Sequence, residues 1–225
     1  MTFQDFQETI IARCHKAGAC KPEFKRLIEA SDRGDKAGFV RVLLDNHGWC
    51  FDRGVYDAEL FLAIDEQHIL LEVGIPTQLN RPIEFQVEEI GGRLWKPFNE
   101  GGTAENGVGD YMTFDEANDP QAGRIVPSVE DFQKLCALPS VWALYQGQFG
   151  RLFDGRLFIP AAGYRHCDDD TLYSVGQRGY SWSSSVPPAG ELSNRAYYLN
   201  FGNAGLYPQG GDNRANGLQV RCLQK

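Results

Sequence analysis

The chain has 225 residues, with 22 Lys and Arg against 30 Asp and Glu, and a formal net charge of −8 at pH 7. Apolar residues make up 42% and charged residues 23%, which excludes a wholly disordered, collagen-like or coiled-coil chain. This length allows one large domain or two small ones. The acidic balance argues against nucleic acid as the main partner, because binding phosphates requires clustered Lys and Arg.

Helical spacing of apolar residues through residues 3–75 predicts a small helical module, residues 1–78. Gly18 is expected to end the first helix, and Pro22 suits the first turn of the second. Asp35 is expected to cap a third helix that stops at Gly48, and Asp57 to cap a short fourth helix. The module pairs no nucleophile with a base, so we assign no catalytic residue.

From residue 69 the pattern changes to short strands, turns and two short helices. Helices are expected near Thr113–Ala117 and from Pro127 onward, where Ser128 and Asp131 have capping-box spacing. Asp154-Gly155 indicates a hairpin turn. Strands are expected over 69–73, 83–87, 141–145, 150–153, 157–159, 180–184, 196–201, 205–207 and 218–223. The fold class is therefore α+β, with the helical module followed by a loop-rich domain, residues 79–225, of short antiparallel strands.

Glycine and charge are distributed unevenly. Six of the 25 glycines precede residue 91, and the remainder follow it. Residues 171–225 hold five basic and two acidic residues, whereas residues 1–170 hold 17 and 28. The last quarter is thus low in acidic charge and rich in Gly, Ser, Asn and Tyr, which makes it the first place to look for a function.

No window of about 18 apolar residues occurs, so we expect no membrane insertion. The first residues lack the basic and apolar regions of a secretory signal. We therefore expect a protein that is cytoplasmic as synthesised, or one that leaves the cell on a virion.

The six cysteines are expected to be reduced thiols. A metal interpretation would gather Cys14, His15, Cys20, His47 and Cys50, but five residues separate the first two cysteines, and common zinc motifs have two to four. We therefore expect incidental or buried thiols, with no metal and no cofactor.

Several segments of the second half carry a family resemblance, the most specific being Asn213-Arg-Ala-Asn-Gly with Val-Arg-Cys222. The others are Gly109–Ala117, Val126–Phe132, Phe158–Arg165, Gly179–Ser185 and Ala196–Phe201. From about residue 90 the chain resembles the C-type-lectin-like fold in its formylglycine-generating-enzyme-like branch. More narrowly, it resembles variable proteins of diversity-generating retroelements and gut Bacteroidetes paralogous surface domains.

The resemblance implies a ligand-binding protein whose C-terminal segment, about residues 171–222, is rewritten by adenine-directed mutagenesis. Template codons rich in adenine, often codons for Asn, become codons for Tyr, Ser, Asp, Gly, Arg, Leu and other residues. The implied ligand-binding positions with that residue menu are Tyr173, Arg178, Tyr180, Ser181, Arg195, Tyr198, Asn200, Asn203, Leu206, Tyr207, Gly210, Gly211 and Asp212. The implied partner is a protein or a cell-surface ligand, and the helical module is expected to attach the receptor to a larger particle.

Tyr, Ser, Gly and Asn dominate antibody paratopes, because Tyr gives a large rigid contact area and the others give adaptable hydrogen bonds. Tyr197 and Tyr198 are neighbours on a predicted strand, so they should face opposite sides, and we expect Tyr198 to face the ligand. Trp182 and Phe201 are expected in the core. Arg214 and Arg221 belong to the family frame and are expected to tie loops to the core.

Three alternatives remain open. One is a lectin-like binding domain that is not diversified. A second is an oxidase of the formylglycine-generating kind, although its reactive cysteines should be close together and Cys167 and Cys222 are far apart in sequence. A third is a calcium-dependent sugar lectin that uses Asp168–Asp170, although the sugar-binding signatures of those lectins are absent.

Overall fold

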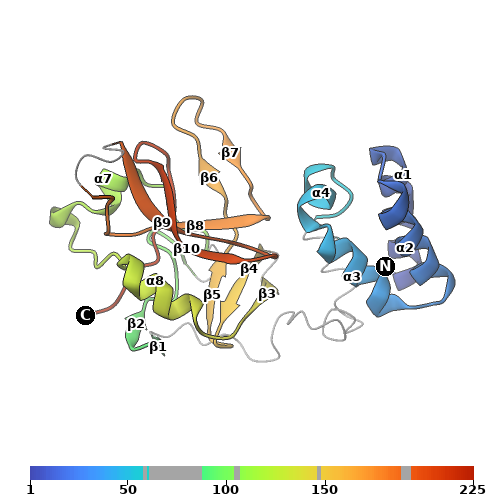
Figure 1. Ribbon diagram of the computed structural model, residues 1–225, viewed down its shortest axis with the longest axis horizontal. Coiled ribbons are helices and arrows are strands. Elements are labelled where there is room, and N and C mark those ends of the chain that lie inside the picture. Colours follow the sequence, from blue (N-terminus) through green and yellow to red (C-terminus); the bar gives the residue numbers. More distant parts are fainter. Residues whose placement is uncertain (58–59, 61–87, 104–106, 146–147, 189–193) are drawn as a thin grey trace. The chain divides into compact units, whose positions relative to one another are not determined.

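A computed structural model describes residues 1–57, 60, 88–103, 107–145, 148–188 and 194–225 (Figure 1). The chain divides into two compact units, Met1–Leu79 with Ala143–Gly147, and Asn80–Trp142 with Gln148–Lys225. Helices make up the described part of the N-terminal region, and small antiparallel sheets with short helices make up the rest. The predicted α+β class is confirmed.

The helical module contains α1 (Phe3–Ala17), α2 (Lys21–Asp32), α3 (Lys36–Asp45) and α4 (His47–Asp52). Its caps follow the sequence: Gly18 ends α1 in the left-handed conformation with φ 73°, and the Asp35 side chain accepts from the Gly38 N–H at the start of α3. The rings of Phe3, Phe6 and Phe39 pack together, with edge contacts of 6.0 and 6.2 Å to Phe39. Apolar packing between helices therefore holds this module together.

The third helix does not stop at Gly48 as predicted. The chain turns at Asn46, whose side chain donates to the Val42 carbonyl, and α4 then runs through Gly48. Asp57 does accept from the Leu60 N–H at 2.8 Å, as a cap would. The rest of that predicted helix and the predicted strands 69–73 and 83–87 lie outside the described residues.

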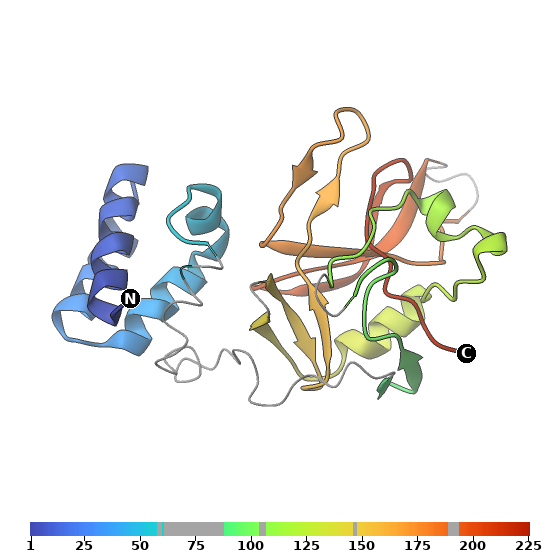
Figure 2. The same cartoon turned by 180° about the vertical axis from the view of Figure 1, so that it is seen from behind.

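The described residues form four small antiparallel sheets, which lie mostly in the second unit (Figure 2). They are β1 (Glu88–Ile90) with β2 (Arg93–Trp95); β3 (Ser140–Tyr145), β4 (Gln148–Phe153) and β5 (Leu157–Pro160); β6 (Tyr164–Arg165) with β7 (Leu172–Tyr173); and β8 (Arg178–Trp182), β9 (Arg195–Gly202) and β10 (Leu206–Asn213). The helices are α7 (Phe114–Ala117), the 3₁₀ turn η1 (Pro120–Ala122) and α8 (Val129–Cys136). In both views the β6–β7 hairpin projects from the unit.

Short sequence motifs mark the starts of α7 and α8 and the turn between β4 and β5. Ser128 and Asp131 form the predicted capping box of α8, and Thr113 and Glu116 form another at α7. Asp154 and Gly155 both have positive φ in the turn between β4 and β5, as a tight hairpin turn requires.

Two predicted strands were wrong in extent or kind. The strand expected over 205–207 continues to Asn213, because β9 pairs with it again from Gly210 to Asn213 after a register shift between Tyr207 and Gly210. Residues 218–223 do not form a regular strand. They make isolated β-bridges to different segments, such as Met112 with Leu218 and Ile125 with Leu223. Because no single segment pairs with several of these residues in succession, a regular strand does not form.

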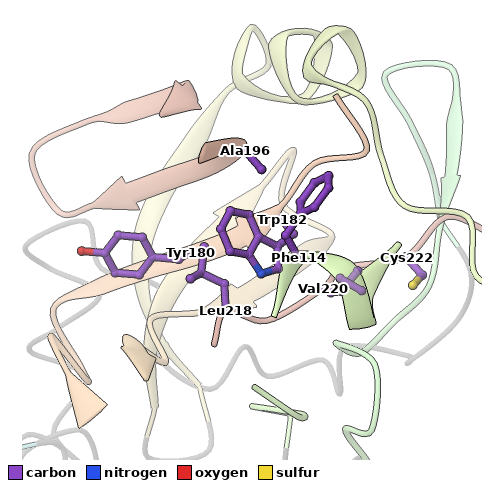
Figure 3. Close-up of a cluster of buried hydrophobic side chains, with 8 residues drawn as sticks. Phe114, Tyr180, Trp182, Ala196, Leu218, Val220 and Cys222 are labelled. Atoms are coloured by element: carbon purple, nitrogen blue, oxygen red, sulfur yellow. The ribbon is translucent and has the colours of Figure 1, made fainter. Parts of the chain in front are cut away.

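A buried cluster joins this C-terminal segment to the sheet of β8, β9 and β10. Leu218, Val220 and Cys222 are fully buried, and they share the cluster with Trp182. Figure 3 shows the indole of Trp182 beside Phe114, with ring centroids 5.6 Å apart. The indole N–H of Trp182 donates to the Met112 carbonyl at 2.8 Å, which satisfies its polar atom. Trp182 is thus core, as predicted.

Arg221 is buried, with 1% of its surface exposed, and ties the terminal segment to the loop after β2. Its guanidinium donates to Asn99 Oδ1 at 2.9 Å, to the Pro97 carbonyl at 2.8 Å and to the Lys96 carbonyl at 3.3 Å. Arg214 pairs with the Asp115 carboxylate and lies over the Phe114 ring. The structural role predicted for both arginines is confirmed.

Candidate functional site

The sheet of β8, β9 and β10 places predicted ligand-binding residues on one shared face. Tyr180 on β8, Asn200 on β9 and Tyr207 on β10 are direct cross-strand partners. In the same way Tyr198 is opposite Gly210. Directly opposed residues of antiparallel strands point to the same side of a sheet. Arg178 and Asp212 occupy this face too, so six predicted positions besides Tyr198 share it.

Four tyrosine rings join this face to the β6–β7 hairpin. Tyr164 stacks on Tyr173 with centroids 5.7 Å apart, and its edge meets Tyr180 at 5.3 Å. Tyr180 in turn contacts Tyr198 at 5.7 Å. We call Tyr164, Tyr173, Tyr180 and Tyr198 the tyrosine cluster. Tyr164 lies before the implied variable segment, residues 171–222, and was therefore not among the predicted positions.

Exposure differs along the face. Tyr207 is 60% exposed and Tyr173 is 42% exposed, and the Arg178 side chain is exposed as well. Tyr198 and Asn200 are half-buried. An apolar body with a polar tip at the surface is what a recognition surface built from tyrosine requires.

Two of the predicted ligand-binding residues, Ser181 and Tyr180, are buried. Ser181 is fully buried, and its hydroxyl oxygen accepts from the Arg221 N–H at 3.0 Å. Tyr180 is only 8% exposed, because the rings of Tyr164 and Tyr198 enclose it. Figure 3 shows its hydroxyl directed away from Trp182. These two residues support the surface rather than form it.

The register also separates some predicted positions from the rest. Arg195, Leu206 and Gly211 pair with Asn213, Phe201 and Tyr197, which puts them on the opposite side of the sheet from Tyr198. Asn203 lies in the turn after β9, where its carbonyl accepts from Arg151. The candidate surface is therefore smaller than the sequence implied.

Tyr197 and Tyr198 are consecutive residues of β9, so their side chains point to opposite sides of the sheet, as predicted. Both are half-buried. Burial raises the pKa of Tyr198 to about 12, and the nearby Asp212 carboxylate adds to that rise. Burial and the neighbouring Tyr180 raise the pKa of Tyr164 as well. Both phenols are neutral hydroxyl groups at pH 7 and can donate to a ligand.

The cysteines lie in contrasting surroundings. Cys222 is fully buried in the Trp182 cluster, and burial raises the pKa of its thiol to about 12. Cys167 is exposed in the loop between β6 and β7. A redox pair needs an accessible thiolate. The environment of Cys222 therefore favours packing over the oxidase chemistry considered above.

In the helical module, Cys14, Cys20 and Cys50 line one pocket with Phe24 and Trp49. Burial raises the pKa of Cys14 to about 11 and that of Cys50 to about 12, so both are protonated thiols at pH 7. His47 Nδ1 lies 2.5 Å from the Tyr56 hydroxyl. These contacts agree with a packing role.

Among the described residues, one group of three metal-ligating side chains has its donor atoms within 4.8 Å of one another: His166, Cys167 and Asp168. This loop overlaps the acidic stretch considered for calcium.

No helix within the described ranges is long and apolar enough to cross a membrane. No protein-family model, curated protein or solved structure matches this chain.

Proposed function

We propose that residues 79–225 form a C-type-lectin-like binding domain whose surface around the tyrosine cluster is diversified to recognise protein or cell-surface ligands. The observation that carries the proposal is the strand register. It places Arg178, Tyr198, Asn200, Tyr207 and Asp212, all implied variable positions, on one face, which they share with the buried Trp182 and Ala196. That face is continuous with the rings of the β6–β7 hairpin.

The division between support and surface agrees with this function. Residues of the family frame are buried: Trp182, Phe201 and Arg221 have at most 1% of their surface exposed. Gly179 is part of that support, because a Cβ there would stand 2.0 Å from the Phe201 ring. A rigid scaffold that carries exchangeable surface side chains is the arrangement that lets one fold bind many partners.

The mixed charge of the face favours protein ligands over nucleic acid. Arg178 and Asp212 share it with neutral tyrosines, and no cluster of Lys and Arg occurs among its members. The proposal also includes that the protein is synthesised in the cytosol and is carried on a virion. In this proposal the helical module attaches the protein to that larger particle.

A pair of display libraries tests the binding claim. One randomises surface positions of the proposed site: Tyr173, Arg178, Asn200, Tyr207 and Asp212. The control randomises exposed positions elsewhere in the same unit: Glu89, Gln121, Glu130, Gln133 and Lys134. Both are selected against lysozyme, which is basic, and serum albumin, which is acidic.

We expect both libraries to fold, and binders to come from the first library alone. Equal yields of binders from both libraries, or loss of folding in the first, would contradict the proposed site. Binders from the first library in a protein whose gene shows no natural variation would favour the lectin-like domain that is not diversified.

A further inference from the structure

The loop between β6 and β7 brings three different metal-ligating side chains together. Cys167 Sγ lies 3.6 Å from Asp168 Oδ1. His166 Nδ1 lies 3.9 Å from Asp168 Oδ2 and 3.7 Å from Asp169 Oδ1. All three donor atoms of His166, Cys167 and Asp168 are within 4.8 Å of one another. The three residues are consecutive, so the conformation of the loop, and not a spaced motif, produces the cluster.

These separations are close to the ligand spacing of a tetrahedral metal centre, and the distance from sulfur to oxygen already agrees with it. Zinc bonds of about 2.3 Å to sulfur and about 2.0–2.1 Å to nitrogen and oxygen place neighbouring ligand atoms roughly 3.3–3.6 Å apart. The observed distances are 3.6 Å from Cys167 Sγ to Asp168 Oδ1 and 3.9 Å from His166 Nδ1 to Asp168 Oδ2. Binding would require His166 Nδ1 and the Asp168 carboxylate to move closer together and would replace the hydrogen bond that His166 Nδ1 accepts from the Asp168 N–H at 3.3 Å.

Contacts outside the cluster hold the loop in this conformation. The Cys167 N–H donates to Oδ1 of Asn216 at 3.0 Å, and Asn216 is itself buried, with 4% exposed. The His166 N–H donates to the Thr171 carbonyl at 3.0 Å. The Asn213 amide lies 3.8 Å from Cys167 Sγ and directs an N–H toward the sulfur. Outer contacts of this kind orient ligands and tune a metal site.

The donor set selects the class of metal. Calcium and magnesium take oxygen ligands, whereas an imidazole nitrogen and a thiolate suit zinc and its neighbours. Asp169 is less available, because its carboxylate accepts from the Thr171 N–H and the Tyr173 hydroxyl. Three protein ligands leave a fourth position for water.

We propose that His166, Cys167 and Asp168 bind one divalent transition-metal ion of the zinc class. On binding, a bond forms between the metal and Cys167 Sγ, and the thiol proton passes to water, so no oxidant or reductant is needed. The site stands independently of ligand recognition. It also lies beside Tyr173, whose hydroxyl donates to Asp169 at 3.2 Å, so bound metal would hold this edge of the tyrosine cluster in place.

Cobalt is the probe for the test, because Co²⁺ occupies zinc sites and its bond to a thiolate gives an ultraviolet charge-transfer band. The full chain, stripped with chelator and kept reduced, is titrated with Co²⁺ and then with Zn²⁺. We expect one equivalent of Co²⁺ to produce the sulfur band and one equivalent of Zn²⁺ to abolish it. Cys167→Ser should remove the band, and His166→Ala should weaken binding by roughly tenfold or more.

Cys20→Ser is the matched control, because Cys20 is the other exposed cysteine. It should keep the full band, and circular dichroism should show that all variants remain folded. No band in the full chain, or a band that survives Cys167→Ser, overturns the proposal. Loss of the band in Cys20→Ser overturns it too and moves the metal to the helical module. Heat on Ca²⁺ titration without Co²⁺ binding would overturn it in favour of a calcium loop.

Discussion

The ring of Tyr198 lies over Gly210, its direct partner on the neighbouring strand, and a Cβ added at Gly210 would stand 2.7 Å from the ring. Tyr198 also meets the edge of Trp182 at 6.1 Å and contacts Tyr180. The missing side chain at Gly210 thus allows a surface tyrosine to rest on the core. This contact links the supporting sheet to the proposed binding face.

Gly210→Ala should therefore disturb the surface more than Gly211→Ala. A methyl group at Gly210 must displace the Tyr198 ring, and we expect a loss of about 1–3 kcal/mol in the free energy of unfolding. Nothing lies within 4 Å of a Cβ at Gly211, so that variant should stay within about 0.5 kcal/mol of the parent. Urea denaturation of both variants measures the difference. Equal stabilities would show that Tyr198 does not rest on Gly210.

Truncating the tyrosines should separate surface from support. Tyr207 is 60% exposed, so Tyr207→Ala should change the free energy of unfolding by no more than about 0.5 kcal/mol. Tyr198→Ala removes ring contacts with Trp182 and Tyr180 and should lower it by about 1–3 kcal/mol while the protein still folds. Thermal unfolding followed by circular dichroism gives both values. An unfolded Tyr207→Ala protein would place that ring in the core.

Arg221→Ala should be among the most damaging single changes. It leaves the buried Asn99 Oδ1 without this donor, at roughly 1–3 kcal/mol, and removes the donor to the partly buried carbonyls of Lys96 and Pro97 as well. Burial lowers the pKa of the guanidinium to about 9, so the side chain is still charged at pH 7. Guanidinium denaturation should show a loss above about 3 kcal/mol. Arg195→Ala, at an exposed position, is the control and should unfold as the parent does.

The Asp131 carboxylate should make the free energy of unfolding fall as the pH is lowered into the acidic range. Burial raises the pKa of its carboxyl, but hydrogen bonds from Ser128 and from Arg93, the latter 2.6 Å away, outweigh that and hold the pKa below its ordinary value. The stabilisation is therefore complete above the unfolded pKa, about 3.9, and is lost as pH falls through the lower folded pKa.

Asp131→Asn should reduce stability at pH 7 by about 1–3 kcal/mol, because it removes a charge-assisted hydrogen bond. It should also flatten the decline in stability below about pH 4. Urea midpoints from pH 7 down to pH 2 measure both effects. Glu130→Gln, at an exposed position of the same helix, should follow the parent curve. A parent-like curve for Asp131→Asn would show that this carboxyl is not linked to folding.

Local chemistry explains what the sequence predicted correctly. The capping box of Ser128 and Asp131 acts within one turn, and Asp154-Gly155 needs only its own backbone angles, so both are visible in the sequence. The burial of Trp182 was expected from its place in the family frame, and Trp182 is fully buried.

What the sequence did not predict depends on distant contacts. Ser181 is buried because Arg221, far along the chain, donates to it, and no local pattern reports that bond. The β6–β7 hairpin pairs only two residues on each strand, which is too short for any periodicity to be recognised. His166 and Cys167 have no motif spacing, so only the folded loop shows that their donor atoms converge.

The most direct test of a diversified binding face is to sequence the locus in many isolates. We predict a neighbouring reverse-transcriptase gene and a near-copy of the segment encoding residues 171–222. Differences between isolates should fall at template adenines, and mainly in the codons for Arg178, Asn200 and Tyr207, with those for Trp182 and Phe201 unchanged. A locus without the near-copy, or variation spread equally over buried and exposed codons, would contradict the account.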